Sequence, residues 1–207
     1  MIVKSAARQA FKERLAFTEL STLELGWHAL GSQVRCFCLE TLQLPPGAVV
    51  TLFGGLSDEI DLVANVMGDL HAAGLRTAVF GLHVDKDNQR AMREMDAYCV
   101  EAAGQLLQGR YGIWEPNQAV TQRLAPEEVA VILVPGLFFT SKDGTRLGRG
   151  GGYFDRYLAR TTAATLKVGV ALDWQVVDSL PLESHDQRMD WLITETQVIR
   201  CQKESAV

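Results

Sequence analysis

The stretch VAVILVPGLFFTSKDGTRLGRGGGYFDRYL (129–158) joins a strand, a glycine-rich segment and the start of a helix. Residues 129–136 form a continuous apolar run, which is typical of a strand covered on both faces. Residues 152–163 have helical character and follow the glycines directly. Alternating strands and helices of this kind build parallel α/β sheets.

The rest of the chain continues this alternation. Further strands are predicted at 48–53, 76–81, 167–172 and 190–196. A helix is predicted over 58–74, with Asp58 as its cap and Gly74 closing it. The segment 86–110 also looks helical, although it is polar and weakly periodic.

Two further helices are predicted over residues 4–42, the second starting at the capping box STLE (21–24) and ending at LPPG (44–47). The chain contains no internal repeat, low-complexity tract or linker. We therefore predict a single α/β domain over residues 1–207. It is a three-layer, doubly wound fold with a mostly parallel sheet and helices on both faces, preceded by an N-terminal helical segment.

Composition excludes several classes of protein. The formal net charge of −5 argues against a general binder of nucleic acid or of anionic membranes. No apolar run approaches the ~20 residues of a membrane span, and the charged N-terminus is not a signal peptide. The four cysteines show no C-x-x-C spacing, so zinc and dithiol signatures are missing. We expect a cytoplasmic monomer with reduced thiols.

The glycines at 148–152 have two interpretations. Glycine lets the backbone approach a ligand closely, and Arg146 and Arg149 could bind phosphate oxygens, so the segment suits a phosphate site. The alternative is a mobile loop with solvated arginines. Composition leaves the two nearly even, and the position between a strand and a helix favours phosphate. The P-loop motif is absent, and the dinucleotide fingerprint would need glycine where Tyr153 stands.

The segment VPGLFFTSKDGTRLGRGGGYFDRYL (134–158) closely resembles the signature of the 5-formyltetrahydrofolate cyclo-ligases, roughly P-G-x-x-F-D-x-x-G-x-R-L-G-x-G-x-G-Y-Y-D-R-x-L. Thr140 replaces the usual aspartate, and Phe154 replaces a common tyrosine. The resemblance continues in SDEIDL (57–62), where Leu62 replaces a threonine, in YGIWEP (111–116) and in LPLESHDQRMDWLITE (180–195). The family's proline after the second strand is missing near Gly81.

The resemblance implies an activity. ATP and 5-formyltetrahydrofolate would give 5,10-methenyltetrahydrofolate, ADP and phosphate, through phosphorylation of the formyl oxygen and attack by N10. ATP and Mg²⁺ are the implied co-substrate and metal. No nucleic acid or membrane partner is expected.

The resemblance also implies the site residues. For ATP they are Lys4, Arg8, Arg146, Leu147, Gly148, Arg149, Gly150, Gly151, Gly152, Tyr153 and Phe154. For the folate they are Gly54, Glu59, Arg149, Gly150, Gly151, Gly152 and Tyr153. Arg149 and Tyr153 are the candidate catalytic residues, and Asp155 and Asp186 the candidate Mg²⁺ ligands.

Simpler roles compete with these assignments. Glu59 also suits a helix N-terminus, and Asp155 could pair with an arginine. Tyr111 and Trp114 are weaker candidates for packing on the folate ring, and His185 has no assigned role.

Two other functions remain open: a non-catalytic module that binds folate or a phosphorylated metabolite, and an enzyme acting on another pterin or thiamine-pathway compound. The joint presence of triphosphate-binding cations (Lys4, Arg8, Arg149) and metal-binding carboxylates (Asp155, Asp186) favours an enzyme.

Overall fold

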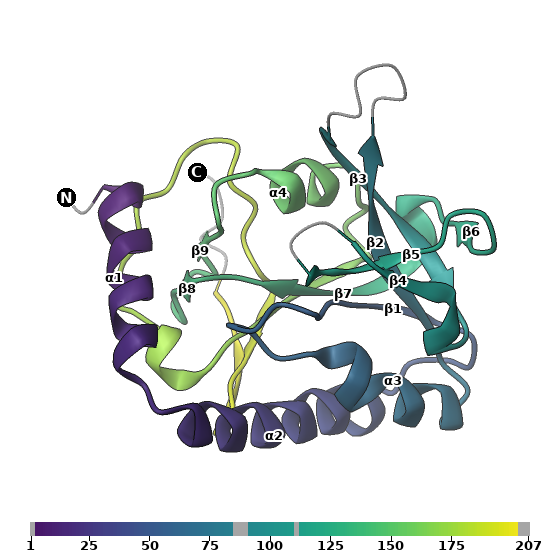
Figure 1. Cartoon of the computed structure of the whole chain (residues 1–207), viewed down its shortest axis with the longest axis horizontal. Coiled ribbons are helices and arrows are strands. Elements are labelled where there is room, and N and C mark those ends of the chain that lie inside the picture. The colour runs from purple at the N-terminus through teal and green to yellow at the C-terminus, as the bar shows by residue number, and fades with distance from the viewer. Residues whose placement is uncertain (1–2, 85–90, 110–111, 203–207) are drawn as a thin grey trace.

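The computed structural model describes residues 3–84, 91–109 and 112–202. Within these ranges, eight strands form one sheet in the order β12-β11-β10-β7-β1-β2-β3-β6 (Figure 1). Their bounds are β1 (Val49–Leu52), β2 (Arg76–Val84), β3 (Ala91–Val100), β6 (Gln122–Arg123), β7 (Val129–Pro135), β10 (Leu166–Val170), β11 (Trp191–Ile193) and β12 (Val198–Arg200). Two small two-stranded sheets are separate from the main sheet in their strand pairing. They are β4 (Leu106–Gln108) with β5 (Trp114–Pro116), and β8 (Phe138–Phe139) with β9 (Arg146–Leu147).

The centre of the sheet is parallel. Strands β11, β10, β7, β1 and β2 run in one direction, and β12, β3 and β6 pair antiparallel at its two ends. In the register, Val131 of β7 pairs with Val50 of β1, and Leu133 pairs with Val168 of β10. The predicted mostly parallel α/β architecture is confirmed.

Helices cover both faces of the sheet (Figure 1). On one face lie α2 (Leu20–Cys36), which continues into a π-helical turn (Phe37–Thr41), and α3 (Leu62–Ala72). On the other lies the short α4 (Tyr153–Leu158). Successive residues of a strand point to opposite faces of the sheet. In β7, Leu133 packs toward α2 and α3, and Ile132 packs toward α4.

The first helix, α1 (Lys4–Phe17), packs at one end of the molecule. Its Phe11 is buried against Trp174 and Phe138, with ring centroids 5.3 and 5.9 Å away. This small core joins α1 to the β8–β9 hairpin, so α1 is positioned by the segment that contains the glycines.

Some predicted helix ends were wrong. Ser21 does not cap α2, because the helix begins at Leu20 with Glu19 as its N-cap residue. Asp58 does not cap α3 either, since Asp61 Oδ1 accepts the Ala64 N–H at 3.0 Å. Gly74 does close α3, with φ +79° and its N–H donated to His71 O at 2.9 Å. The helix predicted over 152–163 ends at Leu158.

The helix predicted over 86–110 was wrong, although residues 86–90 and 110 lie outside the described ranges. From Ala91 to Val100 the chain forms β3, antiparallel to β2. The strand was missed because it contains a buried acid: Asp96 is 1% exposed and pairs with Arg123, Arg160 and His83 at 2.7 to 2.8 Å. The two guanidinium groups offset a charge that otherwise argues against a buried strand, and His83 adds a hydrogen-bond contact.

No helix within the described ranges is long and apolar enough to cross a lipid bilayer. All four cysteines are described, and none forms a disulfide. That the chain is a single domain over residues 1–207 stays a prediction.

Candidate functional site

A narrow apolar slot lies where three parallel strands end. Because β1, β7 and β10 run in the same direction, their carboxyl ends meet at one edge of the sheet, where ligands bind in open α/β folds. The slot is lined by Trp27, Leu30, Phe53, Glu59, Ile60, Pro135, Gly136, Val170, Ala171 and Gln175.

Glu59 is the ionisable member of this lining. Its side chain is 17% exposed. Burial raises the pKa of Glu59 from an ordinary 4.5 to about 7, and the attraction of the Arg149 guanidinium only partly opposes this. The carboxyl therefore ionises readily when a ligand brings N–H donors to it.

Gln175 forms the far wall of the slot and was missed by the sequence analysis. Its Oε1 accepts the Leu172 N–H at 2.8 Å, and its Nε2 donates to Gly136 O at 2.9 Å and Leu137 O at 3.1 Å. These bonds fix the ends of β7 and β10 relative to each other. A single glutamine carries no motif, so only the fold places it here.

The glycine segment crosses the same edge of the sheet. Gly150 and Gly152 have φ of +100° and +66°, conformations that favour glycine. The chain does not pass directly from β7 into the glycines, because the β8–β9 hairpin intervenes. Since α4 has six residues, we attribute the positive charge here to side chains rather than to a helix dipole.

The departure at Thr140 has a local explanation. The Thr140 hydroxyl bonds the carboxylate of Asp143. Asp143 Oδ1 accepts the Thr145 N–H at 3.1 Å, and its Oδ2 accepts the Thr145 hydroxyl at 2.9 Å. Asp143 thus supplies the carboxylate that organises the turn between β8 and β9.

Lys4 and Arg8 lie on one face of α1 and both reach the site. Lys4 Nζ lies 2.7 and 3.0 Å from the two carboxylate oxygens of Asp186. Arg8 Nε donates to Gly148 O at 3.1 Å. The i, i+4 spacing therefore does place two cations beside the glycine segment.

Arg146 and Asp155 pair with each other. Arg146 Nη2 lies 3.0 Å from Asp155 Oδ2, and Nη1 donates to Pro135 O at 3.2 Å. The side chains are 5% and 16% exposed, so this is a buried pair. Asp155 Oδ1 also accepts the Gln187 N–H at 3.2 Å, which places Asp155 beside the segment containing Asp186.

Asp186 lies in an acidic group. Ligand atoms of Glu183, His185 and Asp186 all lie within 4.8 Å of one another. Burial acts to raise the pKa of Asp186, but the bonds from Lys4 and from the Glu183 N–H outweigh it and hold the pKa below its usual range. Asp186 is therefore a carboxylate at neutral pH.

Arg149 extends across the mouth of the slot. Its Nη1 and Nη2 lie 3.0 and 2.7 Å from the oxygens of Asp58, and Nη2 lies 3.4 Å from Glu59 Oε2. The side chain is 47% exposed. One guanidinium thus connects the glycine segment to the loop after β1.

The neighbouring aromatic residues differ in exposure to a ligand. Tyr153 is partly exposed and lies beneath the Arg156 guanidinium, 5.6 Å from ring centroid to Cζ. Phe154 packs edge-on against Phe80, with centroids 5.3 Å apart. Leu147 is 1% exposed and belongs to the core beneath α1, so it could offer a ligand only its backbone.

Gly54 and Trp114 meet at Asp61. A Cβ at Gly54 would lie 2.2 Å from Asp61 Oδ1, so glycine is required by Asp61 itself. The Trp114 indole donates to Asp61 Oδ2 at 2.7 Å, and the Trp114 N–H donates to Gly54 O at 3.1 Å. Trp114 therefore braces the loop that presents Glu59. Tyr111 lies outside the described residues.

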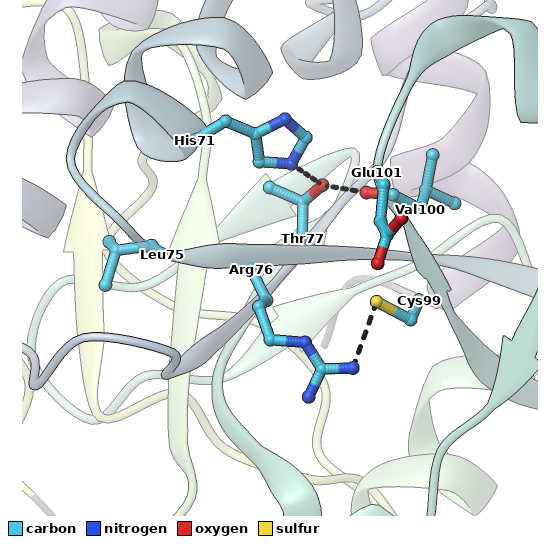
Figure 2. Close-up of a pocket in the computed structure, with 7 residues that line it drawn as sticks. All are labelled: His71, Leu75, Arg76, Thr77, Cys99, Val100 and Glu101. Atoms are coloured by element: carbon cyan, nitrogen blue, oxygen red, sulfur yellow. Dashed lines mark hydrogen bonds between the residues drawn. The ribbon is translucent and has the colours of Figure 1, made fainter.

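A wider cavity, about 260 Å³, lies at the opposite edge of the sheet, where β2 begins (Figure 2). His71 Nε2 lies 2.8 Å from the Thr77 hydroxyl, which donates to Val100 O at 2.8 Å. Arg76 Nη2 donates to Cys99 Sγ at 3.2 Å. Because these polar groups bond one another, we assign this cavity no chemistry.

Comparison with known proteins adds to this geometry. The family model described as the 5-formyltetrahydrofolate cyclo-ligase family matches residues 75–195, more than half of the chain. The chain belongs to this family. The match includes β7, the glycine segment and Asp186, and it confirms the resemblance of the signature.

Curated members of the family match over part of their length. A probable 5-formyltetrahydrofolate cyclo-ligase from Schizosaccharomyces pombe is 34% identical over 119 residues, covering 51% of this chain and 58% of the relative. The 5-formyltetrahydrofolate cyclo-ligase of Saccharomyces cerevisiae is 36% identical over 91 residues, 42% of each chain. The matched region is thus about half the length of these relatives.

Solved structures agree over nearly the whole chain. The 5,10-methenyltetrahydrofolate synthetase of Aquifex aeolicus is 27% identical with a TM-score of 0.74, covering 100% of this chain and 96% of that one. A 5,10-methenyltetrahydrofolate synthetase from Mycoplasma pneumoniae is 21% identical with a TM-score of 0.70, covering 94% and 99%, and bears on the fold alone.

Proposed function

We propose that this protein converts 5-formyltetrahydrofolate to 5,10-methenyltetrahydrofolate, with hydrolysis of ATP to ADP and phosphate. The observation that carries the proposal is the juxtaposition of Glu59 and Arg149. A buried carboxyl in an apolar slot suits the N–H edge of a flat heterocycle, and a guanidinium 3.4 Å from it suits a phosphoryl group.

Folate binding is assigned to the slot, which has to widen to admit the pterin ring because its volume is only about 10 Å³. Ionised Glu59 accepts N–H bonds from the pterin edge, while Trp27 and Phe53 supply apolar surface. Tyr153, which is partly exposed beside the glycine segment, is assigned to pack on the substrate. In this arrangement the glycine segment lies beside the formyl group.

Phosphoryl transfer comes first. The formyl oxygen attacks the γ-phosphorus, the bond from phosphorus to the bridging oxygen breaks, and ADP leaves. Lys4, Arg8 and the glycine segment hold the triphosphate, and Arg149 stabilises charge on the transferred group. The buried Arg146 instead orients Asp155 and fixes the end of β7.

Ring closure follows. N10 attacks the activated formyl carbon, the carbon–oxygen bond breaks with release of phosphate, and N10 gives up its proton to water. The protein contributes positioning, since the nucleophile and the leaving group both belong to bound reactants.

The group formed by Glu183, His185 and Asp186 suits a magnesium ion, because its carboxylates are the hard oxygen ligands that Mg²⁺ prefers. Asp155 is outside this group but accepts the Gln187 N–H, so we assign it to the same site. When bound, the ion would neutralise phosphate charge. Lys4, which now holds Asp186, is among the predicted phosphate ligands.

The departures from the family pattern leave the slot intact. Leu62, in place of threonine, is fully buried in the core between α3 and the sheet. A Cβ at Gly81 would approach Pro116 and the Tyr98 ring to 3.0 Å, so glycine here suits its own neighbours.

The test is a spectroscopic assay. Purified protein with Mg-ATP and 5-formyltetrahydrofolate should generate methenyl-folate absorbance, and Arg149→Lys, which loses the planar fork, should be at least ~10-fold slower. Absorbance no greater than in a no-enzyme control would refute the activity. A non-catalytic binding module would bind folate or nucleotide without folate-dependent ADP release, so ADP is measured in parallel.

A further inference from the structure

The Arg149–Asp58 pair has no part in the proposed reaction. The two residues lie 91 positions apart, yet their side chains meet in a two-point contact of 3.0 and 2.7 Å. Asp58 is not among the residues that line the slot. Its carboxylate faces the guanidinium rather than the space assigned to the folate.

The guanidinium cannot serve all its partners at once. Its paired N–H groups, the edge best suited to a carboxylate or a phosphate, point at Asp58. A γ-phosphoryl group needs the same edge. Nucleotide binding must therefore break the contact with Asp58 before Arg149 can take up its phosphate role.

Glu59 is a second, more distant partner of the guanidinium. Nη2 of Arg149 also lies 3.4 Å from Glu59 Oε2. Folate bound at Glu59 does not remove the Asp58 contact, so Asp58 holds the guanidinium whether or not the folate is present.

We propose that Asp58 is a positioning residue that holds Arg149 away from the nucleotide and competes with phosphate for its guanidinium. The inference rests on the proposed function, because it assumes that Arg149 binds phosphate. Asp58 therefore lowers the affinity of the protein for nucleotide. The pair is partly exposed, so the effect is about two- to fivefold in nucleotide affinity.

The experiment measures binding of a non-hydrolysable ATP analogue with Mg²⁺ by calorimetry. Asp58→Asn should bind the analogue about two- to fivefold more tightly than the natural protein does. An unchanged or weaker affinity of Asp58→Asn would overturn the proposal.

A double-mutant cycle separates a held arginine from a general charge effect. In an Arg149→Gln background, Asp58→Asn should leave analogue binding unchanged. If it tightens binding there equally, the effect comes from removing a negative charge and the proposal fails. Asp69→Asn removes a comparable exposed pair with Arg35, 3.1 Å apart and outside the site, and should leave binding unchanged.

Binding does not require turnover, so the outcomes of the two proposals are separable. Tighter analogue binding by Asp58→Asn, with no methenyl-folate formation by the natural protein, would refute only the activity. Turnover with an Asp58→Asn variant that binds like the natural protein would refute only the role of Asp58. Thermal melts of each variant, with Asp58→Ala as a second replacement, confirm that the folded protein is measured.

Discussion

At the level of single residues, the charge of Glu59 should set the affinity of the slot for the folate. Because its pKa is raised to about 7, Glu59 is mostly protonated below neutral pH and mostly ionised above it. A protonated carboxyl accepts fewer N–H bonds, so affinity for 5-formyltetrahydrofolate should rise up to ~10-fold per pH unit below about pH 7 and then level off. Fluorescence titrations between about pH 5 and 8.5 check this.

Glu59→Gln provides the control. It should bind folate weakly and without this pH dependence; a profile that keeps the same midpoint would assign the titration to another group. Because the folded pKa lies above the ordinary 4.5, the folded state retains a proton between about pH 4.5 and 7. The natural protein should lose stability as pH rises through that window, and Glu59→Gln should lose less.

Asp155 pairs with the buried Arg146 and is also a proposed Mg²⁺ ligand. Asp155→Asn leaves the 5%-exposed Arg146 side chain without its carboxylate, so unfolding should become easier by about 3 kcal/mol. If Asp155 also binds Mg²⁺, the variant should need a much higher Mg²⁺ concentration for activity. Denaturant melts and a Mg²⁺ titration separate the two roles, and unchanged Mg²⁺ dependence would remove Asp155 from the metal site.

The sequence predicts which residues belong to the site better than it predicts which residues they contact. The signature and the i, i+4 pair identify Arg149, Lys4 and Arg8 as cations of one site, and the structure gathers them. Their contacts with Asp58, Asp186 and Gly148 join segments 91, 182 and 140 residues apart. No local pattern specifies such pairs, so they emerge only when the sheet brings the segments together.

At the level of secondary-structure elements, the loop between β1 and α3 is tightly packed at Gly55. Gly55 has φ +97°, and a Cβ there would lie 2.3 Å from Gly112 O and 2.8 Å from Trp114 N. Both neighbours are backbone atoms and cannot rotate away. Gly55→Ala should therefore cost about 2 kcal/mol or more of stability and weaken folate binding, measured by urea melts and titration.

Gly68 is the matched control. It lies inside α3, and a Cβ there would meet nothing within 4 Å. Gly68→Ala should therefore stabilise the protein by about 0.5–1 kcal/mol and leave binding unchanged. Equal stability losses in both variants would refute the steric argument for Gly55.

Strands with apolar runs could be predicted, and the one with a buried charge could not. β1, β7 and β10 are nearly uniform in apolar residues because helices cover both their faces. In β3, Asp96 is balanced by Arg123 of β6 and by Arg160, which follows α4, and it contacts His83 of β2. That compensation is tertiary, so the sequence of β3 alone favours another structure.

For the whole molecule, ligands should act as stabilisers. If folate and nucleotide bind as proposed, each joins segments from distant parts of the chain, and each present at 100 times its dissociation constant should add about 2.7 kcal/mol of stability. For a chain of this size that corresponds to a rise of roughly 5–11 °C in Tm for each ligand. Differential scanning fluorimetry measures it, and Glu59→Gln should lose most of the folate shift and keep the nucleotide shift. Equal losses of both would contradict separate subsites.

The contact between Lys4 and Asp186 also has a consequence for folding. The two residues are separated by 182 positions, so α1 cannot complete the site until almost the whole chain has been ordered. Helices can form early from local contacts, whereas this closure waits for β7, β10 and the segment around Asp186. In refolding from urea, far-ultraviolet circular dichroism should recover before nucleotide binding does, and a protein still being synthesised should acquire its chemistry only as its last strands arrive.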